Sequence, residues 1–259
     1  MTKPRKRAKT QASRGSRKGP SGRAKGRISS HRHTAKYPLW KKLLAAVLIL
    51  FLAGPPLVLL LYRFVPPPVT PLMLIRLAEG EGLDYRWQPI EAISPQLPRA
   101  VIAAEDNRFC EHWGFDFTEL GNTVDDWFAG ERVRGASTIS MQTTKNLLLW
   151  PQRQMVRKLL EAWLTWQLEF LWPKSRIIEV YLNVIEMGPG IYGAEAAAQH
   201  HFGKSAGDLT ARDAALLAAA LPNPRERNAG RPTAGHRQQA KVIETRVGQL
   251  GPLLDCVPQ

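Results

Sequence analysis

The chain has 259 residues and a formal net charge of +14, and the excess positive charge lies at one end. Of its 36 Lys and Arg residues, 13 fall in residues 1–36, which contain no acid; the rest of the chain holds 23 basic and 22 acidic residues. The chain after residue 36 is therefore nearly neutral, and no nucleic-acid-binding motif accompanies the basic residues. The two cysteines show no CxxC spacing, and no HExxH is present, so zinc sites of these types are excluded.

Residues 1–38 form a basic tail that is rich in Lys, Arg, Ser and Gly and has almost no apolar residues. Such a segment buries too little surface to offset its ordering entropy, so we predict a disordered tail. Its charge suits the cytoplasmic side of a membrane and anionic lipid, which we prefer to nucleic-acid binding.

Residues 39–64 contain nineteen consecutive uncharged residues, from Leu43 to Leu61, which is long enough to cross a bilayer. Lys41 and Lys42 precede this run, so the positive-inside rule places the N-terminus in the cytoplasm and the later chain outside. The alternative is a cleaved signal peptide. It would need an unusually long basic region before the apolar run, and no A-x-A cleavage site follows, so we predict an uncleaved anchor.

Residues 65–74 begin with VPPPV and read as a stiff linker. The body beyond it is predicted to be mainly α, because apolar residues recur at helical spacing and no strand pattern is comparably strong. We expect one helix to begin within residues 94–106. Four more are expected at residues 155–172, ended by a proline; 175–188, ended by Gly188; 193–203; and 210–222, with a capping box formed by Thr210 and Asp213.

Three stretches carry candidate chemistry, and the first is AVIAAEDNRFCEHWGFDF, residues 100–117. At helical spacing Glu105, Phe109 and His112 would share a face. A carboxylate at the end of an apolar run has a pKa raised by desolvation, which suits a general base. The alternative is that Glu105 and Asp106 merely end a helix at a solvated surface.

The second stretch, residues 134–146, is dense in small polar groups that could contact an anionic or polyhydroxylated ligand, or could form an ordinary Ser/Thr-rich loop. Its candidates are Ser137, Thr138, Gln142, Lys145 and Asn146. The third stretch, residues 153–161, combines basic residues with one acid on a helix, which suits a phosphate clamp or a surface ion pair. Its candidates are Arg153, Arg157, Lys158 and Glu161.

In order, these motifs resemble the peptidoglycan glycosyltransferase family, glycosyltransferase family 51. The chain shows EDxxFxxHxGxD, then GxSTIxxQxxKN, then RKxxE, then YLNVIEMGPGIYGAEAAAQHHFGK, over roughly residues 75–225. It departs from the family at Met141, where a glutamine is usual. The resemblance implies a lysozyme-like α domain, transfer of a growing glycan on undecaprenyl pyrophosphate to lipid II, and no transpeptidase activity.

By resemblance, Glu105 is the general base and Glu161 a second essential carboxylate. Lys145, Arg153, Arg157 and Lys158 hold pyrophosphates, and the polar motif residues contact substrate or shape the cleft. Asp106 supports the cleft, while His112 has an orienting role. The implied reaction is inverting, because the 4-oxygen attacks the anomeric carbon from the face opposite the α-pyrophosphate and so forms a β-1,4 link. One base is enough, because a pyrophosphate leaving group needs charge neutralisation more than a general acid. The sequence demands no cofactor; a divalent cation, Mg²⁺ or Mn²⁺, at Glu161 would be compatible with it.

The expected organisation is a cytoplasmic tail (1–38), a membrane anchor (39–64), a linker (65–74), a periplasmic catalytic domain (75–225) and a C-terminal extension (226–259). The resemblance places the chain in the bacterial inner membrane, with lipid II and other cell-wall proteins as partners. Residues 116–134, with Trp127 and Phe128, would dip toward lipid or cover the cleft, or bury ordinary aromatics. Two alternatives to a synthase stay open: a lytic lysozyme-like enzyme, and a non-catalytic membrane scaffold.

Overall fold

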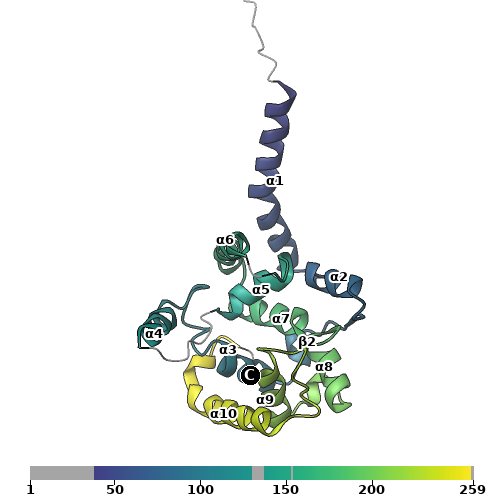
Figure 1. Cartoon of the computed structure of the whole chain (residues 1–259), viewed down its shortest axis with the longest axis vertical. Helices are drawn as coiled ribbons and strands as arrows, with labels where there is room; N and C mark the ends of the chain where they lie inside the picture. Colours follow the sequence, from purple (N-terminus) through teal and green to yellow (C-terminus); the bar gives the residue numbers. More distant parts are fainter. Residues whose placement is uncertain (1–37, 130–136, 153, 258–259) are drawn as a thin grey trace, which may run out of the picture. The chain divides into compact units, whose positions relative to one another are not determined.

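The computed structural model describes residues 38–129, 137–152 and 154–257, and these residues are mainly α-helical, as predicted (Figure 1). The chain divides into two units, residues 1–43 and 44–259, and the second contains every element after the first part of α1. The helices are α1 (Leu39–Tyr62), α2 (Pro71–Ala78), α3 (Gln96–Glu105), α4 (Phe117–Phe128), α5 (Ile139–Leu148), α6 (Met155–Leu171), α7 (Lys174–Val184), α8 (Gly193–Phe202), α9 (Ala211–Ala220) and α10 (Ala234–Leu250).

Helix α1 is the one helix among the described residues that is long and apolar enough to cross a membrane. Its second half is fastened to the body. Phe51 stacks on Trp163 of α6 with ring centroids 5.0 Å apart, and Trp172 Nε1 donates to the Leu59 carbonyl at 2.7 Å. Arg176 of α7 donates to the Tyr62 carbonyl. The exit of the apolar helix is therefore tied to α6 and α7.

The core of the body lies between α3, α7, α8 and α9. Most alanines of α8 and α9, including Ala197 and Ala218, are buried, and these small side chains allow close helix packing. Helix α9 begins at the predicted capping box, in which Thr210 and Asp213 bond reciprocally, and α8 ends at Gly203 with a positive φ of 66°.

Helix α10, which the sequence left outside the catalytic domain, packs against α9 and α3 (Figure 1). Its inward residues His236, Ala240, Ile243 and Leu250 are buried in the same core. His236 Nε2 lies 2.9 Å from the Leu216 carbonyl of α9. The helix therefore belongs to the folded body structurally.

The helix expected to run to Gly188 ends earlier, which corrects the prediction. Helix α7 stops at Val184, and the next residues form β2 (Glu186–Gly188) and β3 (Ile191–Tyr192), which pair antiparallel. A third strand, β1 (Asp84–Tyr85), pairs parallel with β3, so the sheet order is β1-β3-β2. The turn needs glycine: Gly190 has a φ of 68°, and a Cβ there would lie 2.1 Å from the Glu81 carbonyl oxygen.

The two cysteines form a disulfide, with Cα atoms 5.5 Å apart across a sequence separation of 146 residues. Cys110 lies in the turns after α3, and Cys256 follows the 3₁₀ helix Gly251–Leu254. The bond therefore joins the loop that carries the first motif to the C-terminal segment. The sequence left this pairing open.

Candidate active site

The end of α3 opens into a hollow of about 450 Å³ that contains Glu105. Its walls come from four regions: the α3 end, the segment around the start of α4, the start of α5, and the region of α9 and α10. The lining residues are Ala104, Glu105, Asp106, Asn107, Asp116, Glu119, Ser137, Thr138, Gln142, Pro222, Gln239 and Arg246. Four of the predicted candidates beside Glu105 thus share one cavity with it.

Glu105 is largely buried and receives one strong hydrogen bond. Gln142 Nε2 donates to Glu105 Oε2 at 2.8 Å, and the Gln142 amide oxygen accepts from the Tyr181 hydroxyl at 3.1 Å. Burial raises the pKa of Glu105, although the Gln142 hydrogen bond and the charge of Lys145 oppose the shift. Burial also raises the pKa of Tyr181, so its hydroxyl stays protonated and orients Gln142. A carboxyl with a raised pKa is suited to proton transfer near neutral pH.

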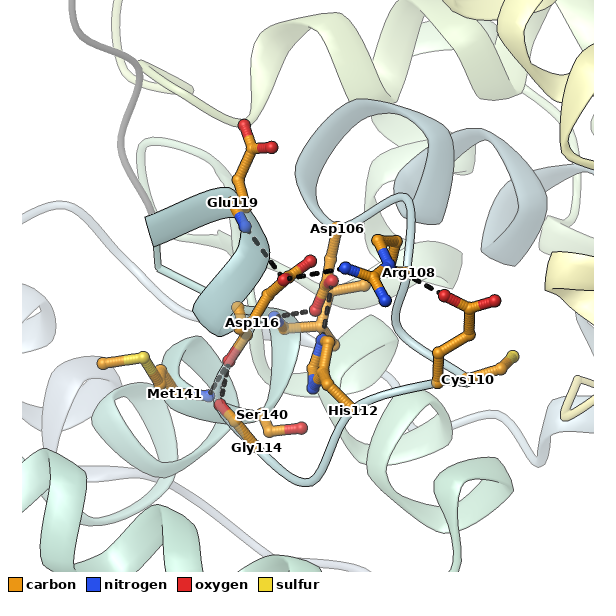
Figure 2. A network of polar contacts seen from close by, with 12 residues as sticks. Asp106, Arg108, Cys110, His112, Gly114, Asp116, Glu119, Ser140 and Met141 are labelled. Atoms are coloured by element: carbon orange, nitrogen blue, oxygen red, sulfur yellow. Dashed lines mark hydrogen bonds and ion pairs between the residues drawn. The ribbon is translucent and has the colours of Figure 1, made fainter. Parts of the chain in front are cut away.

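Asp106 is buried and connects three segments (Figure 2). Its Oδ1 lies 2.8 Å from His112 Nε2, and its Oδ2 accepts from the Ile139 backbone N–H at 2.9 Å. The second bond satisfies a free donor at the start of α5. Asp106 therefore holds the end of α3, the following loop and the first turn of α5 in one arrangement.

The prediction that Glu105, Phe109 and His112 share a helix face is wrong. Helix α3 ends at Glu105, because Asp106 leaves the helix with a φ of −161° and its carboxylate is engaged with His112 and Ile139. Phe109 is fully buried, beneath the Lys174 ammonium at 4.5 Å, and His112 meets its ring edge-on. Phe109 and His112 do not line the hollow; they pack behind it.

The start of α5 is fixed by Thr138. Its hydroxyl donates to the Gly114 carbonyl at 2.7 Å and, as the N-cap, accepts from the Met141 N–H at 3.2 Å. Gly114 has a φ of 80°, and a Cβ there would lie 2.8 Å from Thr165 Cγ2. Thr138 thus anchors the polar motif to the loop after α3, which aims Gln142 at Glu105 one turn later.

The basic motif on α6 is built around Glu161, which is 2% exposed. Arg157 Nη1 donates to Glu161 Oε2, and Lys158 Nζ donates to Glu161 Oε1 at 2.5 Å. Lys158 also donates to Ser137 Oγ at 3.1 Å, which joins the cationic cluster to the rim of the hollow. Lys158 is half-exposed, so its ammonium can also face a ligand.

Lys145 and Asn146 line an adjoining hollow of about 210 Å³, which shares Gln142 and Pro222 with the first. Burial lowers the pKa of Lys145, and the charge of Glu161 opposes that shift. Within the described residues Lys145 forms no ion pair closer than 4 Å, so its ammonium is available to an anion.

A divalent cation at Glu161 does not fit this arrangement. Both Glu161 oxygens already accept hydrogen bonds from cationic side chains. Among residues 38–129, 137–152 and 154–257, no three His, Cys, Asp or Glu side chains come together as ligands.

Of the predicted site residues, Asp106, Ser137, Thr138 and Gln142 line one hollow with Glu105, and Lys145 and Asn146 line the adjoining one. Phe109 and His112 line neither, and Arg153 lies outside the described residues. Sequence reasoning missed Tyr181, and it missed Gln239 and Arg246 of α10. Tyr181 could have been noticed as a hydroxyl inside the apolar run of YLNVIE; the two α10 residues carry no comparable signal.

Comparison with known proteins identifies the family. Residues 74–247 match the Transglycosylase family. A biosynthetic peptidoglycan transglycosylase of Caulobacter vibrioides is 52% identical over 221 residues, covering 85% of this chain and 96% of the relative. A protein of that description from Rhodospirillum centenum is 57% identical over 187 residues, covering 72% and 81% respectively. The resemblance drawn from the motifs is confirmed, and the chain belongs to the transglycosylase family.

Proposed function

We propose that this chain is a peptidoglycan transglycosylase that polymerises lipid II into β-1,4-linked glycan and releases undecaprenyl pyrophosphate. The observation that carries the proposal is the position of Glu105: a largely buried carboxylate with a raised pKa, in a cleft whose rim holds a cationic cluster. The names of the relatives support the same reaction class.

In the proposed reaction, Glu105 takes the proton of the acceptor's sugar 4-hydroxyl. The freed 4-oxygen attacks the anomeric carbon of the growing glycan from the face opposite its α-pyrophosphate. The C–O bond to pyrophosphate breaks, and the electron pair leaves with the phosphate oxygen. Lys145, Lys158 and Arg157 neutralise the charge that develops on the leaving group, so one base is sufficient. Arg153 is assigned to the same role by its place in the motif.

The remaining site residues act by position. Glu161 holds Arg157 and Lys158 at the rim through both carboxylate oxygens. Asp106 fixes the loop and the α5 start that frame Glu105, and His112 completes that contact. Ser137 connects the polar motif to Lys158. These groups would keep the base and the cations in register with the two substrates.

The membrane arrangement is part of the proposal. α1 serves as an inner-membrane anchor with a cytoplasmic N-terminus, and the body lies in the periplasm. The disulfide between Cys110 and Cys256 fits an oxidising compartment. Helix α6, to which α1 is fastened, exposes large apolar side chains on its outer face, as expected of a surface that meets lipid. They are Met155, Val156, Leu159, Trp166 and Phe170.

The product distinguishes the proposal from its alternatives. We would incubate the full chain in detergent with fluorescent lipid II, separate the products by gel electrophoresis and digest them with muramidase; isolated sacculi would be incubated in parallel. We expect muramidase-sensitive polymer and intact sacculi. Degraded sacculi would favour a lytic enzyme, and a folded chain without either activity would favour a scaffold.

A further inference from the structure

One wall of the Glu105 hollow is supplied by α10. Gln239 and Arg246 line this wall, seven residues and two helical turns apart. Ile243 lies between them on the same side of the helix and is 1% exposed, packed into the core. The buried residue fixes the helix, so the two polar side chains project from the edge of its inward face into the hollow that also contains Glu105.

Within the part of the chain that the structure describes, the side chains of Gln239 and Arg246 form no hydrogen bond or ion pair. Arg246 is half-buried, yet no described carboxylate lies within 4 Å of its guanidinium, and it donates to no described acceptor. Two other arginines in this region are engaged: Arg227 donates to the Ala219 carbonyl at 2.8 Å, and Arg237 donates to the Pro232 carbonyl at 2.6 Å. An available guanidinium in a cleft beside the reacting group is suited to a carboxylate or a phosphate.

The position of α10 in the body selects between these two anions. The C-terminal end of α1, where the proposed anchor joins the body, is held by α6 and α7 through Trp172 and Arg176. α10 packs instead on α9 and α3. The lipid-borne pyrophosphates belong with the anchor and with the cationic cluster of α6. The substrate group next to α10 is therefore the part of the glycan that points away from the lipid.

We propose that α10 forms a subsite for the peptide substituent of the acceptor, in which Arg246 binds a carboxylate and Gln239 hydrogen-bonds a neighbouring amide. The proposal rests on the proposed function, because lipid II brings both a stem peptide and a pyrophosphate to the site. Arg246 and Gln239 then determine which peptide-bearing glycans are accepted, whereas Glu105 performs the chemistry.

The test measures lipid II polymerisation by the full chain with Arg246→Ala and Gln239→Ala. Matched controls are Arg237→Ala and Gln238→Ala, whose parent residues lie on the same helix but line a separate hollow without Glu105. We expect the KM for lipid II to rise about tenfold in Arg246→Ala, equivalent to about 1.4 kcal/mol, with kcat within twofold of wild type. Arg246→Lys should recover part of the loss, and the controls should match the wild type.

A second substrate tests whether the group that Arg246 binds is a stem-peptide carboxylate. Lipid II with amidated stem-peptide carboxylates should raise the KM of the wild type and abolish its difference from Arg246→Ala. If Arg246→Ala behaves like Arg237→Ala, or if its defect persists unchanged with the amidated substrate, the proposal is overturned. Circular dichroism checks folding, and the amidated substrate tests the wild type even where a variant fails to fold. A wild type that forms no polymer would overturn the proposed function itself.

Discussion

Replacing Asp106 by alanine should destabilise the body and reduce activity together, because this one carboxylate serves two buried partners. The substitution leaves the Ile139 N–H and the His112 ring without their acceptor. Each orphaned buried donor costs about 1–3 kcal/mol, and the substitution leaves two of them. We therefore expect a loss of about 3 kcal/mol in the free energy of unfolding.

Asp106→Asn distinguishes the contribution of the hydrogen-bond geometry at Asp106 from that of its negative charge. The amide keeps one oxygen that can accept from the Ile139 N–H, and its NH₂ can donate to His112 Nε2 if the ring changes tautomer. Its loss of stability should therefore be about 1 kcal/mol, since both contacts are remade without the charge. Activity should fall less than in Asp106→Ala.

Thermal unfolding of the full chain in detergent provides the assay. For a body of this size, about 3 kcal/mol lowers Tm by roughly 6–12 °C. Asp84→Ala is the control, because Asp84 forms an exposed pair with Arg86, and such pairs contribute little. A Tm for Asp106→Ala within a degree of Asp84→Ala would refute the view that Asp106 joins the three segments.

Three further predictions follow from the site and the fold. Gln142→Leu removes the hydrogen bond that lowers the pKa of Glu105, so the acid limb of kcat/KM should move to higher pH; an unmoved limb would separate Gln142 from the base. Reducing the Cys110–Cys256 bond should cost up to about 5 kcal/mol by loop entropy, seen as a lower Tm with dithiothreitol. Gly190→Ala should leave little folded protein in a protease-resistance assay, because its Cβ would clash with a backbone carbonyl at 2.1 Å.

The sequence motifs predicted which residues belong to the site, but they predicted less well how those residues are arranged in space. The order of the motifs placed Glu105, Gln142 and Glu161 in one family site, and the structure brings Gln142 to Glu105. The prediction that Glu105 and His112 share a helix face is wrong, because the carboxylate of Asp106, the residue at which α3 ends, bonds to Ile139, far along the chain. Local periodicity contains no information about such a partner.

Helix ends were predicted where the signal is local and missed where it is not. Helix α8 ends at Gly203 and helix α9 begins at Thr210, both as predicted from the sequence. α7 ended early because the turn after it is set by Gly190 against the backbone of Glu81, a contact across more than a hundred residues. The part of α10 in the cleft was missed for a similar reason: Arg246 is recognisable only once its helix is packed on α9 and α3.

The effect of Glu105→Gln on polymerisation is the most direct test of Glu105 as the general base. The glutamine keeps the size and the hydrogen-bonding capacity of the side chain but cannot accept the hydroxyl proton. With Glu91→Gln as the exposed control, we expect a loss of at least a hundredfold in kcat for lipid II, at unchanged Tm, because general-base catalysis contributes about 10²–10⁴-fold. Polymerisation at a near-normal rate by folded Glu105→Gln would mean that a different group is the base.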